Sequence, residues 1–367
     1  MSGALRVVVA GGGVTGSLIA LKLASAGLSV VLVDPAPVGD NASGVAAGML
    51  APAFETVLDD AGADHFNLLR AGRDLWPSIL ARLGGAGVGF RSAGALWVDR
   101  RGDAAKRSEM LVRSLAAIGA VAALLHPSQA LDLAPGLVAD IDAAVFTSDD
   151  WLIDAVLALS AIRIAVLRAG CECVTARVLS YDECMVRLSG GAEVIADRLI
   201  LATGAGEQSL APELASLSPI KGQILRFAGR GPAVGPAIRC SGGYAAPASE
   251  GVLVGATMEA GKTDLMVDEA KVETLSALAA SLYPALAGQR PRAAAGVRAA
   301  TPDGLPLVGA SAREGVLLAV GMRRNGWLLA PLAAEIIAAD LVGDDPGPHA
   351  LRLEARRFDQ IAPPAHG

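Results

Sequence analysis

The sequence predicts an α/β fold in which a domain with a parallel sheet is interrupted by a second domain with a mixed or antiparallel sheet. The chain opens on "VVVAGGGVTGSLIALKLASAGLSVVLVDPAP" (7–37), where two apolar runs flank a glycine turn and a helical segment. It is 53% hydrophobic but only 4% aromatic, which suits buried parallel strands rich in small aliphatic residues. Segments 86–100 and 217–257 instead alternate apolar and polar residues, a pattern typical of antiparallel strands.

The opening stretch is as apolar as a membrane anchor, but its residues exclude one. Four glycines, at 11, 12, 13 and 16, interrupt it where a spanning helix should be strongest, and Lys22 lies in its middle. A secretory leader also fits poorly, because Arg6 is the one basic residue before the run and the run is too long. We therefore expect no membrane span and a cytoplasmic protein.

The same stretch fits a dinucleotide site of the Rossmann type. Its predicted elements are a strand at 5–10, a helix at 14–26 and a strand at 29–33. Gly11, Gly13 and Gly16 form a G-x-G-x-x-G turn, in which the backbone approaches a pyrophosphate at the helix N-terminus. Asp34 follows the second strand, eighteen residues after Gly16, where a carboxylate accepts hydrogen bonds from ribose hydroxyls.

The remaining elements follow from periodicity and from glycine and proline punctuation. They are a small-residue loop entering a helix (40–52), a helix (64–85), a strand (88–100), two helices (103–136), a helix (151–170), a strand-rich stretch ending in "ADRLILATGAG" (196–206), short strands (220–257), and helices at 268–287 and 326–342. "RLILATGA" is the best candidate for a further parallel strand beside the opening pair.

The order of these elements predicts that the second domain is discontinuous and is formed by two separate segments of the chain. With 367 residues it has room for two domains. We assign residues 1–85, 140–215 and 295–367 to the dinucleotide domain. Residues 86–139 and 216–294 form the substrate-binding domain.

Charge and cysteine content exclude several classes of partner. The net charge is −6 and no basic block occurs, so nucleic acid and anionic membranes are poor partners. Cys171, Cys173, Cys184 and Cys240 have no nearby histidine, and we interpret them as small apolar residues of strands. We predict no metal site, and no serine triad is visible.

Three later features favour FAD over NAD. Thr203-Gly204 ends a strand with small residues, where a second turn can approach the nucleotide. "TPDGLPLVG" (301–309) predicts a turn that packs closely against a flat chemical group. Asn325-Gly326 begins a helix, and a helix N-terminus aimed at the flavin ring stabilises negative charge on its reduced form.

At this point the sequence resembles the D-amino-acid oxidase superfamily of FAD-dependent amine oxidoreductases, and within it the glycine oxidase branch linked to thiamine biosynthesis. The matching stretches span nearly the whole chain in the family's order: "GGGVTGSLIALKLA", "ASGVAAGMLAP", "ILATGA", "PIKGQILRF", "GGYAAP", "VGATME", "AGVRAATPDGLPLVG" and "GMRRNGWLLAP". The resemblance implies an FAD domain capped by a substrate domain. No cysteine or histidine stands at the family's positions for covalent attachment, so we expect non-covalent FAD.

The resemblance also implies the chemistry, which is oxidation of a small primary or secondary amino acid. The substrate Cα–H would deliver hydride to flavin N5, giving an imine and then an oxo acid, and O2 would be reduced to H2O2. Arg298 is the expected carboxylate clamp, because a guanidinium fork holds a carboxylate bidentately. The hydroxyl of Tyr244 would reach the same carboxylate. Arg324 matches the family's arginine beside the flavin, although the sequence leaves open whether Arg323 or Arg324 faces it.

The expected cofactor-binding residues lie in the matching motifs. They are Gly11, Gly13, Val14, Thr15, Gly16, Asp34, Ser43, Ala46, Ala47, Gly48, Met49, Val178, Thr203, Gly204, Arg298, Arg324, Asn325, Gly326 and Trp327. Ala46 to Met49 would line the flavin edge, Ser43 would contact phosphate or ribitol, and Val178 would meet the adenine through its main chain.

Three departures from the family pattern leave the substrate open. Gly242 stands where glycine oxidases carry a histidine, Ala248 replaces a basic residue, and Met322 replaces a histidine or similar group. The alternatives are a sarcosine, D-amino-acid or N-methyl amino-acid oxidase or dehydrogenase with another electron acceptor, a nicotinamide dehydrogenase, and a non-catalytic flavoprotein subunit. The expected partners are a small amino acid and O2, and the resemblance allows a homo-oligomer.

Overall fold

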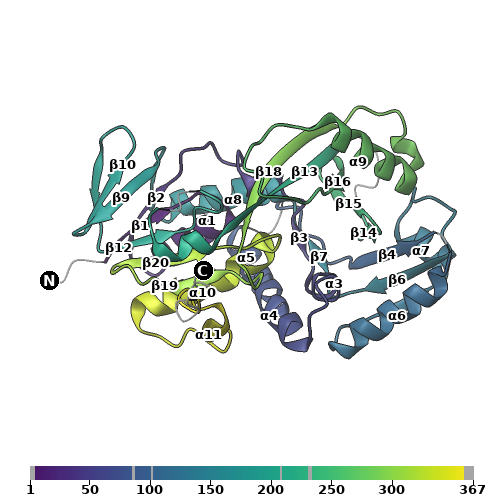
Figure 1. Cartoon of the computed structure of the whole chain (residues 1–367), viewed down its shortest axis with the longest axis horizontal. Coiled ribbons are helices and arrows are strands. Elements are labelled where there is room, and N and C mark those ends of the chain that lie inside the picture. Colours follow the sequence, from purple (N-terminus) through teal and green to yellow (C-terminus); the bar gives the residue numbers. More distant parts are fainter. Residues whose placement is uncertain (1–4, 85–86, 101, 207–208, 230–233, 359–367) are drawn as a thin grey trace, which may run out of the picture.

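The computed structural model describes residues 5–84, 87–100, 102–206, 209–229 and 234–358. Its strands form two main sheets, which occupy the two halves of the molecule in Figure 1. The outer ends of the predicted domain segments, at 1–4, 85–86 and 359–367, lie outside the described residues.

The first sheet contains the opening strands and is parallel except at one edge. In the described residues its order is β19-β20-β12-β1-β2-β8. Its strands are β1 (Arg6–Ala10), β2 (Ser29–Val33), β8 (Glu172–Val174), β12 (Arg198–Leu201), β19 (Leu307–Ala310) and β20 (Val316–Val320). β19 pairs antiparallel with β20, while β12 pairs parallel with β1, as "RLILATGA" predicted.

Both faces of this sheet are covered, which is why its strands are continuous apolar runs. Val7 and Val9 pack against three helices on one face, α1 (Val14–Ser25), α8 (Ala155–Arg168) and α10 (Gly326–Val342). Val8 and Ala10 point to the other face, because side chains alternate along a strand. That face is covered by an antiparallel sheet of β9 (Val178–Asp182), β10 (Met185–Leu188) and β11 (Glu193–Ile195).

The second main sheet is mixed. Its described strands are β4 (Ala95–Asp99), β5 (Ala123–Leu125), β6 (Ala143–Thr147), β13 (Ser218–Ala228), β14 (Ala237–Cys240), β15 (Gly243–Ala248), β16 (Gly251–Gly255), β17 (Glu259–Ala260) and β18 (Arg292–Ala300). Its neighbours are antiparallel except that β14 runs parallel to β4. The long strands β13 and β18 reach toward the first sheet (Figure 1).

The other helices and short elements connect or cover these sheets. They are α2 (Ala42–Val45), α3 (Pro52–Leu58), α4 (Ala63–Asp74), α5 (Trp76–Arg82), α6 (Ala104–Ala117), α7 (Pro127–Leu133), α9 (Glu269–Leu282), α11 (Ala350–Leu353), the 3-10 turns η1 (Pro212–Ser216) and η2 (Pro284–Leu286), and the ribbon of β3 (Met49–Leu50) with β7 (Trp151–Leu152). In the described residues, no helix is both long and apolar enough to span a bilayer.

Several elements differ from the sequence prediction for local reasons. The helix predicted at 64–85 is two helices, because Pro77 in the first turn of α5 lacks an N–H and starts a new helix. The strand predicted at 88–100 shrinks to Ala95–Asp99, after Gly94 at φ +80°. The helix predicted from 151 begins at Ala155, because the Asp154 carboxylate caps it by accepting from Val156 and Leu157.

Sheet membership also departs from two predicted domain boundaries. The sequence predicts residues 143–147 in the dinucleotide domain, but β6 pairs with β4 and β5 in the mixed sheet. β18 begins at Arg292 and pairs with β13 along its whole length, so the boundary at 295 cuts a strand. The division into two domains remains a prediction, with these two boundaries moved.

Candidate functional site

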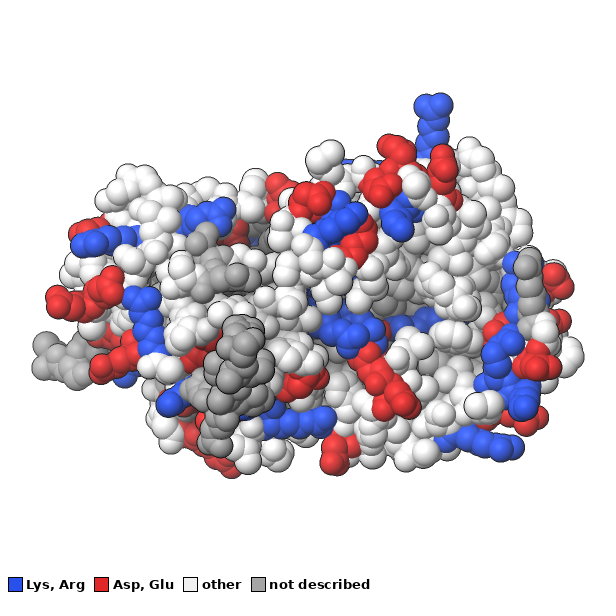
Figure 2. All heavy atoms as spheres, viewed as in Figure 1, with Lys and Arg blue, Asp and Glu red and all other residues white. Residues whose placement is uncertain are grey.

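A cavity of about 540 Å³ lies where the two main sheets meet, a volume typical of small-molecule sites. Figure 2 shows a hollow near the middle of one face, with basic side chains gathered in it beside acidic ones. The predicted residues that line the cavity are Thr15, Ser43, Ala46, Ala47, Gly48, Met49, Gly204, Tyr244, Arg298, Arg324, Asn325, Gly326 and Trp327. They come from segments that are far apart in the sequence.

The glycine turn between β1 and α1 is packed too closely for any side chain. Gly11 has φ +112°, and a Cβ there would collide with the carbonyl of Ala202. A Cβ on Gly16 would collide with the carbonyl of Gly11. The turn therefore holds α1 against the strands, and the first amides of α1, beside Thr15 in the cavity wall, have no partner within the helix. Such a helix N-terminus is an anion site that suits a pyrophosphate.

Asp34 and Ser43 secure this turn. One carboxylate oxygen of Asp34 accepts a hydrogen bond from the amide of Gly12, and the other accepts from the amide of Ala36 at 2.7 Å. The Ser43 hydroxyl accepts from the amide of Val14 at 3.1 Å. Each carboxylate oxygen of Asp34 keeps a further lone pair, so the expected ribose contact fits the observed bonds.

We expect Asp34→Ala to weaken FAD retention at least tenfold, because it removes both the ribose acceptor and the bonds that hold the turn. The measurement is the FAD dissociation constant from fluorescence recovery after dialysis. Asp40→Ala, an exposed carboxylate in the same loop, is the matched control and should retain FAD. Full occupancy of Asp34→Ala after extended dialysis would count against the ribose role.

The N-terminus of α10 also opens on the cavity. Asn325, Gly326 and Trp327 all line it, and the helix begins at Gly326 as predicted. The indole N–H of Trp327 donates to the carbonyl of Ser43 at 3.0 Å, which ties α10 to the loop that carries the predicted flavin-edge residues. Positive helix ends therefore face the cavity from α1 and from α10.

Some predicted residues lie outside the cavity lining. The turn beside the cavity is formed by Gly11, Gly13, Val14 and Gly16. Thr203 precedes the lining residue Gly204, and its hydroxyl donates to the carbonyl of Gly206. Val178 is 4% exposed and packs in the core under the first sheet. None of residues 301–309 lines the cavity; Asp303 in that turn pairs with Arg357 at 2.8 Å.

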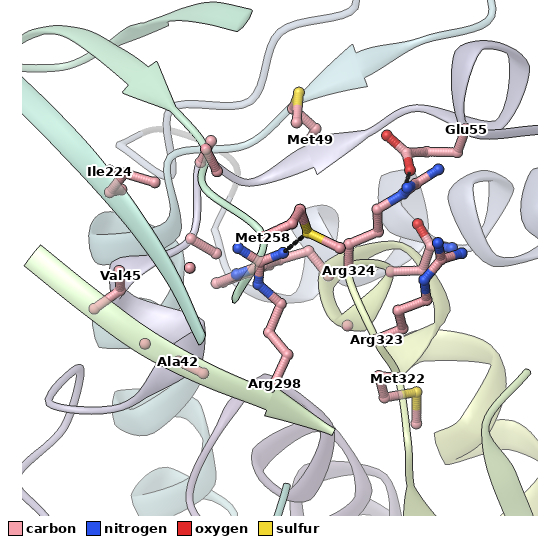
Figure 3. A pocket seen from close by; sticks show the side chains of 18 of the residues that line it. Ala42, Val45, Met49, Glu55, Ile224, Met258, Arg298, Met322, Arg323 and Arg324 are labelled. Carbon is pink, nitrogen blue, oxygen red and sulfur yellow. Dashed lines mark hydrogen bonds and ion pairs between the residues drawn. The ribbon is translucent and has the colours of Figure 1, made fainter. Parts of the chain in front are cut away.

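Arg298 faces the cavity without a carboxylate partner among the described residues. It lies on β18, and its Nη1 donates to the sulfur of Met258 at 3.1 Å (Figure 3). Burial lowers the pKa of its guanidinium, and the positive charges of Arg324 and Arg323 lower it further. A half-buried cation whose one hydrogen bond goes to a thioether is a site for an anion.

Tyr244 lies near Arg298 with its phenol in the cavity wall. Its hydroxyl sits against Gly255 on the neighbouring strand, where an added Cβ would be 2.7 Å from it. Burial raises the pKa of Tyr244, and the positive charges of Arg298 and Arg239 oppose that rise. The phenol is therefore protonated at neutral pH and available as a hydrogen-bond donor.

Glu55 joins two further arginines at the cavity and was missed by the sequence analysis. It is 5% exposed on α3, and its Oε1 accepts from Nη2 of Arg239 at 2.6 Å. Its Oε2 accepts from Nε of Arg324, as Figure 3 shows. Burial raises the pKa of Glu55, but the two guanidiniums outweigh burial and hold the pKa below its usual value. Glu55 is therefore ionised.

Asp59, the C-terminal cap of α3, completes the network. It pairs with Nη1 of Arg323 at 2.8 Å and with Nη2 of Arg324 at 2.8 Å. Arg323 and Arg324 both line the cavity, so the structure does not single out one of them. An acidic residue inside the apolar segment "PAFETVL" was the available clue to Glu55, and "AIRC" in a strand was the clue to Arg239.

Comparisons with known proteins agree on one family. The model described as FAD dependent oxidoreductase (DAO) matches residues 6–340. A glycine oxidase of Pseudomonas aeruginosa is 28% identical over 358 residues, covering 93% of this chain and 96% of that protein. The bifunctional tRNA 5-methylaminomethyl-2-thiouridine biosynthesis protein of Caulobacter vibrioides is 33% identical, covering 96% of this chain and 58% of that protein.

Solved structures show the same architecture. The crystal structure of glycine oxidase from Geobacillus kaustophilus matches with a TM-score of 0.84 at 25% identity, and the match covers 96% of this chain and 99% of that chain. Because the match covers nearly the whole chain, the likeness includes both main sheets.

Proposed function

The chain belongs to the DAO family of FAD-dependent oxidoreductases, and from this premise we propose that it acts on amines and oxidises a small amino acid of the glycine or sarcosine type. The products would be an imine, which hydrolyses to an oxo acid, and H2O2 from O2. FAD as the family's cofactor removes the nicotinamide alternative.

The observation that carries the proposal is Arg298. It is a half-buried guanidinium on the cavity wall, and its one hydrogen bond in the described residues goes to the Met258 sulfur. A substrate carboxylate would replace this weak acceptor with a charge-assisted, bidentate contact. The protonated phenol of Tyr244 would donate a further hydrogen bond to the same carboxylate. Together the two residues would fix the substrate by its acid end and leave its amine and α-carbon free to react.

The cavity fits FAD on independent grounds. The crowded glycine turn and the N-terminus of α1 would hold the pyrophosphate, and Asp34 would hold the ribose. Bound FAD supplies the two-electron acceptor that side chains cannot provide. Ala46 to Met49 and the N-terminus of α10 would border its ring, where the helix end stabilises negative charge. We expect the binding to be non-covalent.

The described lining contains no histidine, and its one carboxylate, Glu55, is bound to two arginines. A strong general base is therefore not apparent in this wall. The residues would act by holding the substrate with its amine neutral and by excluding water, since positioning contributes much of the rate in such sites.

The test is a peroxide-coupled assay of the purified FAD-loaded protein with glycine, sarcosine, D-alanine and D-proline. We expect peroxide with glycine and sarcosine. If the substrate bleaches the flavin in the absence of air but no peroxide forms in air, the protein is a dehydrogenase that uses another electron acceptor and is not an oxidase. If no amino acid bleaches the flavin, the proposal fails.

A further inference from the structure

We propose that Arg239 forms a second anion site in the same cavity, so that the preferred substrate is an amino acid that carries a second carboxylate. This inference rests on the proposed function and adds to it a substrate class. Arg239 was not among the residues that the sequence analysis assigned to the site.

The cavity carries more positive than negative side chains, and a substrate with a single carboxylate does not neutralise the excess. Four arginines line it in the described residues, Arg239, Arg298, Arg323 and Arg324. The carboxylates paired with them are Glu55 and Asp59. Two positive charges therefore remain. A substrate with one carboxylate and a neutral amine compensates one of them, and a dicarboxylate compensates both.

Arg239 itself is incompletely bonded. It is 5% exposed, and in the described residues its hydrogen bonds all start from Nη2, to Glu55 and, at 3.5 Å, to the sulfur of Met49. Its Nε is buried without a hydrogen-bond partner. Buried donors are rarely left unpaired in proteins, so the guanidinium of Arg239 can still donate a hydrogen bond to a bound anion.

Asp150 is the other acidic group near Arg239, and it compensates the charge only in part. Its two oxygens accept from the amides of Ala53 and Phe54, and burial raises its pKa to about 7. Near neutral pH Asp150 is therefore only partly ionised, and Glu55 and Asp150 together raise the pKa of Arg239 despite its burial, so Arg239 stays charged.

The chain leaves room beside Arg239. The turn from β14 to β15 consists of Ser241 and Gly242, both of which line the cavity. A Cβ built on Gly242 meets nothing within 4 Å, so open space lies there. This is the position at which the sequence departs from the histidine of glycine oxidases, and the missing side chain would admit a longer substrate.

Arg239 and Arg298 flank Tyr244 in the sheet. The strand order is β14-β15-β16-β13, and β18 pairs with β13 on the far side. Arg239 on β14 is the direct cross-strand partner of Tyr244 on β15, whereas Arg298 lies on β18. A substrate whose first carboxylate binds Arg298 and Tyr244 would therefore extend its other end toward Arg239.

The test compares two amines that differ in one carboxylate, sarcosine and iminodiacetate, with the FAD-loaded enzyme. We expect kcat/KM for iminodiacetate to exceed that for sarcosine at least tenfold. D-aspartate in the same assay shows whether a side-chain carboxylate reaches the site as well as a carboxylate on the amine substituent.

Arg239→Met, which keeps an unbranched apolar stem but removes the guanidinium and its charge, should reduce the iminodiacetate-to-sarcosine ratio at least tenfold. Arg239→Lys should restore part of the ratio. Arg187→Met, the same change at an exposed ion pair in the three-stranded sheet, should leave the ratio unaltered. An unchanged ratio in Arg239→Met, or a wild type that prefers sarcosine, would overturn the proposal.

A binding measurement on the wild type covers the case in which Arg239→Met fails to fold. Malonate and acetate are titrated against the flavin absorption spectrum, and we expect malonate to bind at least tenfold more tightly. Equal binding would refute the second anion site. If neither amine bleaches the flavin, the proposed function fails, and the malonate titration still decides the second site.

Discussion

Arg298→Ala should raise the KM for the amino-acid substrate roughly 10- to 150-fold while FAD stays bound. The estimate corresponds to losing a charge-assisted contact worth about 1.5–3 kcal/mol. The structure supports a role in substrate binding, because Arg298 has no carboxylate partner in the described residues and its one hydrogen bond there goes to the Met258 sulfur. Its removal should therefore cost little stability. Steady-state kinetics and the flavin absorption spectrum measure the two effects.

Two further variants separate binding from structure. Arg298→Lys keeps the charge but loses the planar fork, so its KM should fall between those of the wild type and Arg298→Ala. Arg187→Ala removes an arginine from an exposed ion pair and should leave KM unchanged. An unchanged KM in Arg298→Ala would remove this residue from the substrate site.

Glu55→Ala should have the largest effect on stability, lowering the free energy of unfolding by about 3–5 kcal/mol. The side chain is buried and is the shared partner of Arg239 and Arg324. Deleting it leaves the buried Arg239 without its carboxylate partner and Arg324 with Asp59 alone, and breaking a buried pair by removing one partner is strongly destabilising. Urea unfolding followed by circular dichroism, at one saturating FAD concentration, measures the change.

The matched control is Glu193→Ala, which removes an exposed carboxylate paired with Arg187 at 3.1 Å. Exposed pairs contribute about 0–1 kcal/mol, so this variant should unfold close to the wild type. Glu55→Gln, which keeps the shape and some hydrogen bonds, should lie between the two. Equal stability of Glu55→Ala and Glu193→Ala would show that water reaches the arginine cluster.

The elements that the sequence predicted well are those with strong local determinants. The opening strand, helix and strand are present, and the last helix runs over Gly326–Val342 as predicted. Glycine turns, apolar periodicity and helix ends are encoded within a few neighbouring residues. By contrast, β6 could not be assigned to its sheet from "AAVFT", because a short apolar strand does not identify its pairing partner.

The candidate site divides in the same way. Arg298 and Tyr244 stood in recognisable motifs, and the structure brings both to one cavity, although their roles remain predictions. Glu55 and Arg239 are 184 positions apart and carry no motif that joins them. Their pairing arises only when α3 packs against the mixed sheet.

By itself, the sequence determined the dinucleotide turn, the α/β class and the family, because each depends on local spacing and on small residues at fixed positions. Only the tertiary structure decided which charges meet at the cavity. It leaves Arg298 without a carboxylate partner in the described residues and places Glu55 between two arginines. The physical reason is that Coulomb interactions depend on distance and burial, and both are set by packing between segments remote in the chain.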